Sequence, residues 1–288
     1  MTKVLVTGSK GQLGMELKSL DNYFPNFSFF WTDKENLDIE NFIEVENFIL
    51  KNKVEVLINC AAYTNVDKAE EEAELADRIN SEAVKSLASI AKKHNLKLIH
   101  ISTDYVFDGN SITSYIESDK TNPQNIYGLT KLKGEKYLLE INPCNSVIIR
   151  TSWLYSEFSA NFVKTILKLA AQKKTISVIS DQKGSPTYAN DLAKVILKLI
   201  PLIKNKDVQI YHYANKGECS WFQFAQEIVK LSDEKCIVKP IFASEFKSKA
   251  KRPNFSILNT KKIEKEFDIQ IPYWQTSLNN CISKIMNR

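Results

Sequence analysis

A short strand runs directly into a glycine-rich turn in the stretch VLVTGSKGQLG, residues 4–14. The apolar run predicts a buried strand, and the residues after the turn open a helix. Gly8 permits the tight turn, Gly11 lets the backbone approach a pyrophosphate, and Gly14 allows the helix to pack close to the strand. The N-terminus of that helix would offer free N–H groups and a partial positive charge to phosphates. This stretch therefore predicts a dinucleotide site rather than a turn without a ligand.

Apolar runs alternate with longer amphipathic segments throughout the first half of the chain. Strands are predicted at Val4–Val6, Phe27–Trp31, Val54–Asn59, Leu96–Ile101 and Ser146–Arg150. Helices are predicted at Asn41–Lys51, Glu70–His94 and Thr130–Glu140. This alternation indicates an α/β fold with a Rossmann-type, doubly wound parallel sheet that is covered by helices on both faces.

The pattern changes after Trp153. Helices are predicted at Ala160–Lys173, Ala189–Leu199, Trp221–Leu231, Thr260–Phe267 and after Trp274, with a strand at Gln209–Ala214 and loops at Ser180–Pro186 and Ile241–Ser256. We expect residues 1–150 to form an NAD(P)-binding Rossmann domain. We expect residues 151–288 to form mainly a smaller substrate-binding lobe, with some segments returning to the main sheet.

The composition is that of an ordinary globular protein, with 39 basic and 34 acidic residues in 288 and a net charge of +5. The basic cluster Lys247, Lys249, Lys251 and Arg252 is more typical of a solvated loop than of a nucleic-acid surface, although it could also grip a phosphorylated substrate. The apolar stretch Val195–Ile203 is too short to span a bilayer. We therefore expect neither a nucleic-acid nor a membrane partner.

The cysteines and the N-terminus bear on the compartment. Five cysteines are dispersed without a Cys-x-x-Cys pair, which indicates buried thiols in a reducing environment. No signal peptide precedes the first strand. We expect a cytoplasmic protein.

The ends of the later strands carry candidate cofactor contacts. Asp33 ends the second strand, where an acid usually binds the adenosine ribose of NADH. Lys34 could instead pair with a 2′-phosphate, so NADPH stays open as an alternative. Asp38 and Ile39 could hold the adenine edge, and the small residues of Asn59–Thr64 would let a cofactor lie against the backbone.

Tyr127 and Lys131 are four residues apart on a predicted helix, so both project from one face. A lysine beside a phenol lowers the tyrosine pKa and makes the phenol a usable proton donor. Thr103 ends a predicted strand at the edge of the sheet where ligands bind, and its hydroxyl could polarise a substrate carbonyl. Together with the glycine loop, these three residues predict reduction of a carbonyl group.

The chain resembles the dTDP-4-dehydrorhamnose reductase family, within the extended short-chain dehydrogenases. The matching motifs cover nearly the whole chain in order: Gly-x-x-Gly-x-x-Gly (8–14), Ser102–Gly109, Tyr127–Glu135, Arg150–Tyr155, Asp181–Thr187, Gly217–Trp221 and Arg252–Asn259. The family reduces the 4-keto group of dTDP-4-dehydro-6-deoxy-L-mannose to give dTDP-L-rhamnose.

The resemblance implies roles for individual residues. Thr103, Tyr127 and Lys131 would be the catalytic triad, with Tyr127 as proton donor. Substrate contacts would come from Thr103, Asp104 and Trp153, with Asn161 and Arg252 as further candidates for the diphosphate. Cofactor contacts would come from Gly8, Gly11, Gln12, Leu13, Gly14, Asp33, Asp38, Ile39, Ala61, Ala62, Tyr63, Thr64, Tyr127 and Lys131.

Some members of the family resemble metal-bridged homodimers built from surface glutamates. Glu16 matches one such position, whereas Asn190 stands near where another acid would be expected, which speaks against a bridging Mg²⁺. The three histidines are dispersed without ligand spacing, so we predict no catalytic metal.

Two other kinds of protein, dehydratases and non-catalytic regulatory subunits, are alternatives to a reductase. Related dehydratases resemble Thr-Asp-Glu after the same strand, and here Tyr105 replaces the second acid, so elimination is disfavoured; an epimerase or another nucleotide-sugar reductase stays open. A non-catalytic nucleotide-binding regulatory subunit could share the fold, but it would be free to lose Tyr127 or Lys131, which this chain keeps.

Overall fold

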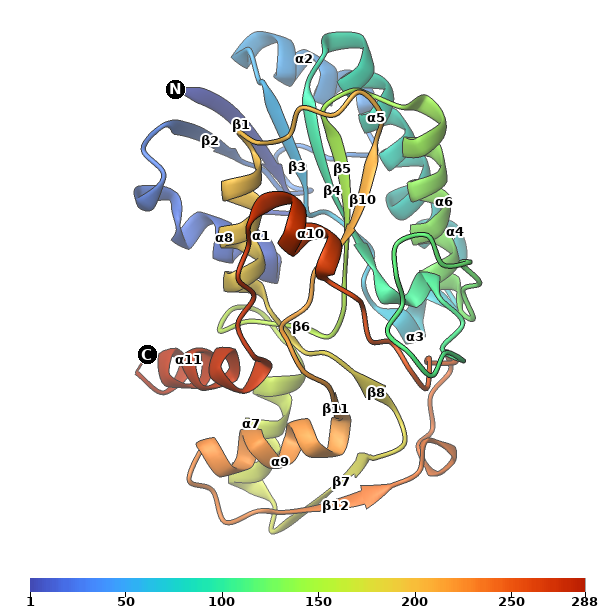
Figure 1. Ribbon diagram of the computed structural model, residues 1–288, viewed down its shortest axis with the longest axis vertical. Coiled ribbons are helices and arrows are strands. Elements are labelled where there is room, and N and C mark those ends of the chain that lie inside the picture. The colour runs from blue at the N-terminus through green and yellow to red at the C-terminus, as the bar shows by residue number, and fades with distance from the viewer. Residues whose placement is uncertain (288) are drawn as a thin grey trace.

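A six-stranded parallel sheet forms the centre of the computed structural model, which describes residues 1–287, and its strand order is β10-β5-β4-β3-β1-β2 (Figure 1). The strands are β1 (Thr2–Thr7), β2 (Phe27–Trp31), β3 (Val56–Asn59), β4 (Lys97–Thr103), β5 (Ser146–Thr151) and β10 (Gln209–His212). Because every pair is parallel, the carboxyl ends of these strands meet at one edge of the sheet. A ligand site is expected outside that edge.

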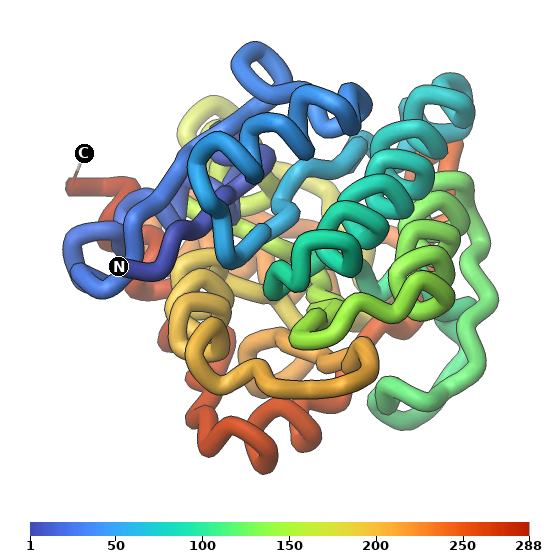
Figure 2. Tube along the Cα trace, turned by 90° about the horizontal axis from the view of Figure 1, so that it is seen from above, coloured from blue at the N-terminus to red at the C-terminus, as the bar shows by residue number. Residues whose placement is uncertain are grey.

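Helices cover both faces of the sheet, as the sequence predicted. One face carries α1 (Gln12–Ser19) and α8 (Ala189–Leu199), and the other carries α2 (Phe42–Asn52), α5 (Ala83–His94) and α6 (Ile126–Ile141), which lie side by side in Figure 2. Val4 and Val6 pack with the first group and Leu5 with the second. Strands that are apolar on both faces are buried on both, so the doubly wound α/β prediction is confirmed.

The predicted single helix at Glu70–His94 is wrong. That region holds α3 (Val66–Ala69), α4 (Ala73–Asp77), the π-helical segment Arg78–Glu82 and α5. The π segment places Asn80 where its side chain bonds the backbone of Tyr63 and the hydroxyl of Thr130. These tertiary contacts compensate for the interrupted helix, and apolar periodicity alone does not report them.

The remaining elements pack mainly around a second core, below the sheet in Figure 1. They are α7 (Phe162–Gln172), α9 (Trp221–Leu231), α11 (Trp274–Met286) and the parallel pair β7 (Thr175–Ile179) and β12 (Ile237–Ile241), which the sequence did not predict. Short strands β6 (Leu154–Tyr155) and β9 (Thr187–Tyr188) pair, as do β8 (Lys183–Gly184) and β11 (Cys219–Ser220). Completing the fold are α10 (Lys261–Phe267) and three 3-10 turns, Asp21–Tyr23, Asp104–Val106 and Ala243–Glu245.

The two halves of the chain share the central sheet. β10 pairs with β5, and α8 packs against α1, although both β10 and α8 follow residue 151. No helix within residues 1–287 is long and apolar enough to cross a membrane.

Candidate active site

A cleft of about 720 Å³ lies at the carboxyl edge of the sheet and extends towards the second core. Its walls bring together most of the predicted site residues: Gly8, Gly11, Gln12, Leu13, Gly14, Asp33, Asp38, Ile39, Ala61, Ala62, Thr64, Thr103, Asp104, Tyr127, Lys131 and Trp153. Its size falls within the usual range for small-molecule sites. Residues that are distant in sequence therefore share one pocket.

The glycine turn has the geometry that a dinucleotide needs. Gly8 has φ +66°, and a Cβ there would lie 2.6 Å from the Ala61 nitrogen. A Cβ on Gly14 would lie 2.4 Å from the Gly8 carbonyl oxygen, so only glycine permits this close approach. Within residues 1–287, no side chain caps the N-terminus of α1, where Gly11 is the N-cap residue. Free N–H groups at a helix start fit a pyrophosphate.

Charged residues of both signs surround the end of the cleft beside Asp33. Asp33 accepts hydrogen bonds from the backbone nitrogens of Lys10 (2.9 Å) and Lys34 (2.8 Å). This fixes its carboxylate beside the cleft, while the Lys10 and Lys34 side chains remain largely exposed. The acid suits a free ribose hydroxyl, and the lysines suit a 2′-phosphate. These residues fit NADH and NADPH alike.

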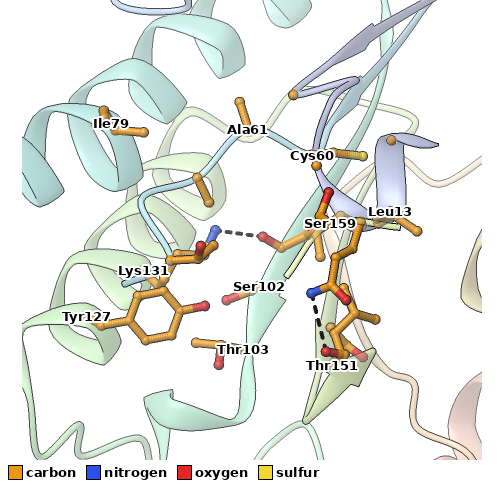
Figure 3. A pocket seen from close by; sticks show the side chains of 18 of the residues that line it. Leu13, Cys60, Ala61, Ile79, Ser102, Thr103, Tyr127, Lys131, Thr151 and Ser159 are labelled. Carbon is orange, nitrogen blue, oxygen red and sulfur yellow. Dashed lines mark hydrogen bonds between the residues drawn. The ribbon is translucent and has the colours of Figure 1, made fainter. Parts of the chain in front are cut away.

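Tyr127 extends from α6 towards Ser102 and Thr103 at the end of β4 (Figure 3). Lys131, one turn further along the same helix, extends to the Ile101 carbonyl oxygen on that strand. Asn125 caps this helix by accepting a hydrogen bond from the Gly128 nitrogen, at 2.8 Å. A Cβ on Gly128 would lie 2.2 Å from the Tyr105 carbonyl oxygen, so glycine lets the helix start directly against the end of β4. The first turn of α6 is thereby held beside the strand that carries the predicted hydroxyl.

Burial controls the protonation of these groups. It raises the pKa of Tyr127 to about 12, and hydrogen bonding with Thr103 only partly opposes this rise. Burial lowers the pKa of Lys131 to about 8. Burial therefore outweighs any lowering of the Tyr127 pKa by Lys131, whose Nζ donates a hydrogen bond to the Ile101 carbonyl oxygen, 2.6 Å away. Tyr127 is a neutral phenol and still holds the proton that it would donate.

Asp104 is a second buried acid at the same strand end. Thr103 Oγ1 donates to its Oδ1 over 3.0 Å, and the side chain is 2% exposed. Burial raises the pKa of Asp104 to about 7, and the hydrogen bond from Thr103 opposes this rise. Near neutral pH this carboxyl can therefore be protonated and donate a hydrogen bond to a bound hydroxyl, or ionised and accept one from it.

An aromatic wall closes the far side of the cleft. The Trp153 indole stacks on that of Trp221, with centroids 3.4 Å apart and planes 4° from parallel. Trp153 has φ +46°, an outlying conformation for a bulky residue. A Cβ on Gly184 would lie 2.4 Å from the Trp153 ring, so that glycine makes room for the indole. Contacts from two other elements thus hold a strained residue in place.

Three predicted residues lie outside the lining of this cleft. Asn161 caps α7 by accepting a hydrogen bond from the Lys164 nitrogen. Arg252 pairs with Asp67, whose Oδ2 is 2.7 Å from Nη2, and this ion pair holds the pKa of Asp67 well below its usual range. Tyr63 donates its hydroxyl hydrogen to Glu72. A role for any of them in binding remains a prediction.

Glu16 is buried, at 0% exposure. It accepts hydrogen bonds from Ser156 Oγ (2.7 Å) and Asn190 Nδ2 (2.8 Å). Burial raises its pKa to about 8, and the neighbouring Glu157 adds to the rise. A protonated, fully buried carboxyl does not suit a surface metal bridge, and residues 1–287 contain no cluster of three or more His, Cys, Asp or Glu side chains that could hold a metal ion.

Several site residues were missed by the sequence argument. Lys10, Ile79 and Trp221 line the cleft, and Gly184 makes room for Trp153, which also does. Trp221 lies in a motif noted in the sequence, directly after the Ser220 capping box, but that signal marks a helix start and not a pocket wall.

The fold and the cleft define an NAD(P)-binding oxidoreductase of the extended short-chain dehydrogenase class. Comparison with known proteins identifies the family within this class. Residues 1–287 match the model of the RmlD substrate binding domain family. The dTDP-4-dehydrorhamnose reductase of Aggregatibacter actinomycetemcomitans is 39% identical, over 97% of this chain and 98% of that protein.

Solved structures of similar fold point to the same family. A dTDP-4-dehydrorhamnose reductase from Clostridium acetobutylicum has a TM-score of 0.93 and 40% identity, covering 99% of this chain and 100% of the other. The Bacillus anthracis enzyme in complex with NADP has a TM-score of 0.92 and 38% identity, with 99% of each chain covered. The chain belongs to the RmlD family, that of the dTDP-4-dehydrorhamnose reductases.

Proposed function

We propose that this protein reduces the 4-keto group of dTDP-4-dehydro-6-deoxy-L-mannose to give dTDP-L-rhamnose, using NADPH or NADH. The observation that carries the proposal is the convergence of Thr103, Tyr127 and Lys131 on the cleft that also contains the glycine turn. The names of the relatives supply the substrate, and the geometry supports the reaction class.

The reaction is a hydride transfer to C4 followed by protonation of the oxygen, and a bound nicotinamide supplies the hydride. Gly8, Gly11 and Gly14 would let the backbone hold the diphosphate of that cofactor. Thr103 would donate a hydrogen bond to the substrate carbonyl, which requires its hydroxyl to turn from Asp104. Tyr127 would give its proton to the developing alkoxide, which is a much stronger base than a phenolate.

The remaining cleft residues would hold the sugar nucleotide. Asp104 would bind a sugar hydroxyl and Trp153 would pack against the substrate. Arg252 could reach the diphosphate only by exchanging its partner Asp67, and a guanidinium suits that bidentate anionic group.

The alternatives are less well supported by the site. A dehydratase of this fold needs an acid where Tyr105 stands, and burial raises the pKa of Tyr105 above its usual value, so it does not supply a carboxylate's chemistry. A regulatory subunit would not need Tyr127 and Lys131 to converge on Thr103.

Replacement of Tyr127 by Phe tests the proposal. The variant should lose turnover by about 100-fold or more, because it loses a proton donor, while the Kd for NADPH changes less than about twofold. Turnover is followed by the absorbance of reduced nicotinamide with the dTDP-4-keto-6-deoxy sugar. Tyr137→Phe on the same helix, outside the cleft, is the matched control and should retain activity. Unchanged turnover in Tyr127→Phe would contradict the mechanism.

The proposal also includes the cellular location and the oligomeric state of the protein. All five cysteines are unpaired, which supports a cytoplasmic location. We also propose a homodimer, by resemblance; because Glu16 is buried, the dimer would not rely on its carboxylate as a metal ligand.

A further inference from the structure

A row of buried polar side chains crosses the sheet behind Lys131. Thr7, Asn59 and His100 are register partners on β1, β3 and β4, and each is at most 1% exposed. Thr7 Oγ1 donates to Asn59 Oδ1 (2.7 Å), Asn59 Nδ2 lies 3.1 Å from His100 Nδ1, and His100 Nε2 lies 3.3 Å from Lys131 Nζ. The row therefore connects the strand of the glycine turn to the lysine of the proposed catalytic triad.

The hydrogen bonds of this row fix the direction of the Asn59 amide. The backbone N–H of Ala61 can only donate, and it donates to Asn59 Oδ1 at 3.2 Å. The amide nitrogen of Asn59 must then face His100, and it too can only donate. His100 Nδ1 is therefore an acceptor without a hydrogen. In a neutral imidazole the hydrogen must then be on Nε2.

We propose that His100 is a positioning residue that turns this Nε2–H towards Lys131 Nζ and so sets the protonation state of the lysine. A neutral amine can accept that hydrogen, whereas an ammonium would bring two donors together. The proposal rests on the proposed catalytic role of Lys131. Neither the family resemblance nor the Tyr-x-x-x-Lys motif assigns a role to His100.

The other groups that face Lys131 do not determine its protonation state, so the contact with His100 does. Glu135 would favour the ammonium, but its carboxylate is paired with Arg150, whose Nη2 is 2.6 Å away. Burial raises the pKa of the Cys60 thiol to about 12, so that group is neutral, as is Tyr127. The Ile101 carbonyl oxygen takes one hydrogen of Nζ in either state.

His100 itself cannot take up the proton in place of the lysine. Burial and the neighbouring Lys131 hold the pKa of His100 well below its usual range. The imidazole therefore stays neutral across the physiological range, and its tautomer stays that dictated by Asn59. An ammonium at Lys131 would help Tyr127 to release its proton by stabilising the phenolate. The protonation of Lys131 thus defines the alkaline limit of the reaction.

The first test measures the tautomer directly, without relying on activity. Nitrogen-15 NMR of the full chain bound to NADP should show His100 protonated on Nε2 and not on Nδ1 from pH 6 to 8. An Nδ1–H tautomer, or an imidazolium in this range, would overturn the proposal. Because this measurement needs no turnover, it remains decisive even if the proposed substrate is wrong.

The second test replaces His100 by Gln, whose carbonyl oxygen can turn towards Lys131 as an acceptor. The alkaline limb of kcat/KM should move upward by about one pH unit, because an acceptor favours the ammonium. His212→Gln is the matched control: this histidine is also 0% exposed, but its ring faces Arg150 and the Tyr115 carbonyl oxygen. A lower Tm in both variants with no pH shift in either would show a purely structural role and overturn the proposal.

Discussion

The cofactor end and the substrate end of the cleft are built in different ways. At the proposed cofactor end, the glycine turn lies at the centre of the site, and close backbone-to-backbone approaches hold it, from Gly8 to Ala61 and from Gly14 to Gly8. At the proposed substrate end, side chains from separate segments meet, as in the stack of Trp153 on Trp221. The first kind of site depends on how closely backbone segments approach one another, whereas the second depends on how side chains of distant elements pack. Substitutions should therefore damage the two ends differently.

Gly8→Ala should have the largest effect and would test the close backbone packing at the proposed cofactor end. A Cβ at φ +66° and 2.6 Å from the Ala61 nitrogen should destabilise the protein by about 2–4 kcal/mol. Thermal and urea unfolding measure this change. Gly11→Ala is the control: its Cβ would meet only the Gly8 carbonyl oxygen, at 3.2 Å, so stability should change by less than about 1 kcal/mol. Equal stability of Gly8→Ala and the wild type would contradict the claim that close backbone packing at Gly8 holds this end of the cleft.

Gly184→Ala should affect the substrate end alone. The added Cβ would lie 2.4 Å from the Trp153 ring and displace the indole from the cleft wall. We expect KM for the sugar nucleotide to rise about tenfold, because the displaced ring no longer orients the substrate. The Kd for NADPH, measured by fluorescence titration on the same variant, should stay unchanged. A parallel loss of cofactor affinity would show that the two ends are not independent.

Glu16→Gln should have the smallest effect, at the junction of the two ends, where α1 meets Ser156 and Asn190. The folded pKa of Glu16 is about 8, above an unfolded value of about 4.5, so the folded protein binds the extra proton between these values. The free energy of unfolding should therefore fall as pH rises from about 4.5 to 8. Burial would raise the pKa of Glu157, but hydrogen bonds, first among them that with Glu16, lower it, so Glu157 affects the free energy of unfolding only at lower pH.

The glutamine variant removes this dependence and keeps the hydrogen-bonding shape of a protonated acid. Its Tm should exceed that of the wild type by several degrees at pH 8.5 and match it at pH 5. Calorimetry at the two pH values gives the comparison, with the exposed Glu44→Gln as control. A Tm lower than that of the wild type at pH 8.5 would mean that the Glu16 carboxylate is stabilising.

The same division explains what the sequence could predict. The glycine turn and the Tyr127–Lys131 pair are spacings within one element, and the structure brings them into one cleft. The contributions of Gly184, Trp221 and His100 depend on which segments become neighbours, and one sequence does not contain that information. The prediction of helix from Glu70 to His94 failed for a related reason, since apolar periodicity does not reveal an inserted turn of another pitch.

That inserted turn, the π-helical segment Arg78–Glu82, also sets the direction in which its side chains leave the helix axis. Each residue of an α-helix turns the chain by about 100° about its axis. Removing one residue here would restore ordinary winding and swing Asn80 away from Tyr63 and Thr130, which it now joins. The segment around Tyr63 and helix α6 are thus kept in alignment by the inserted turn, so the spacing of the chain in this segment matters as much as its composition.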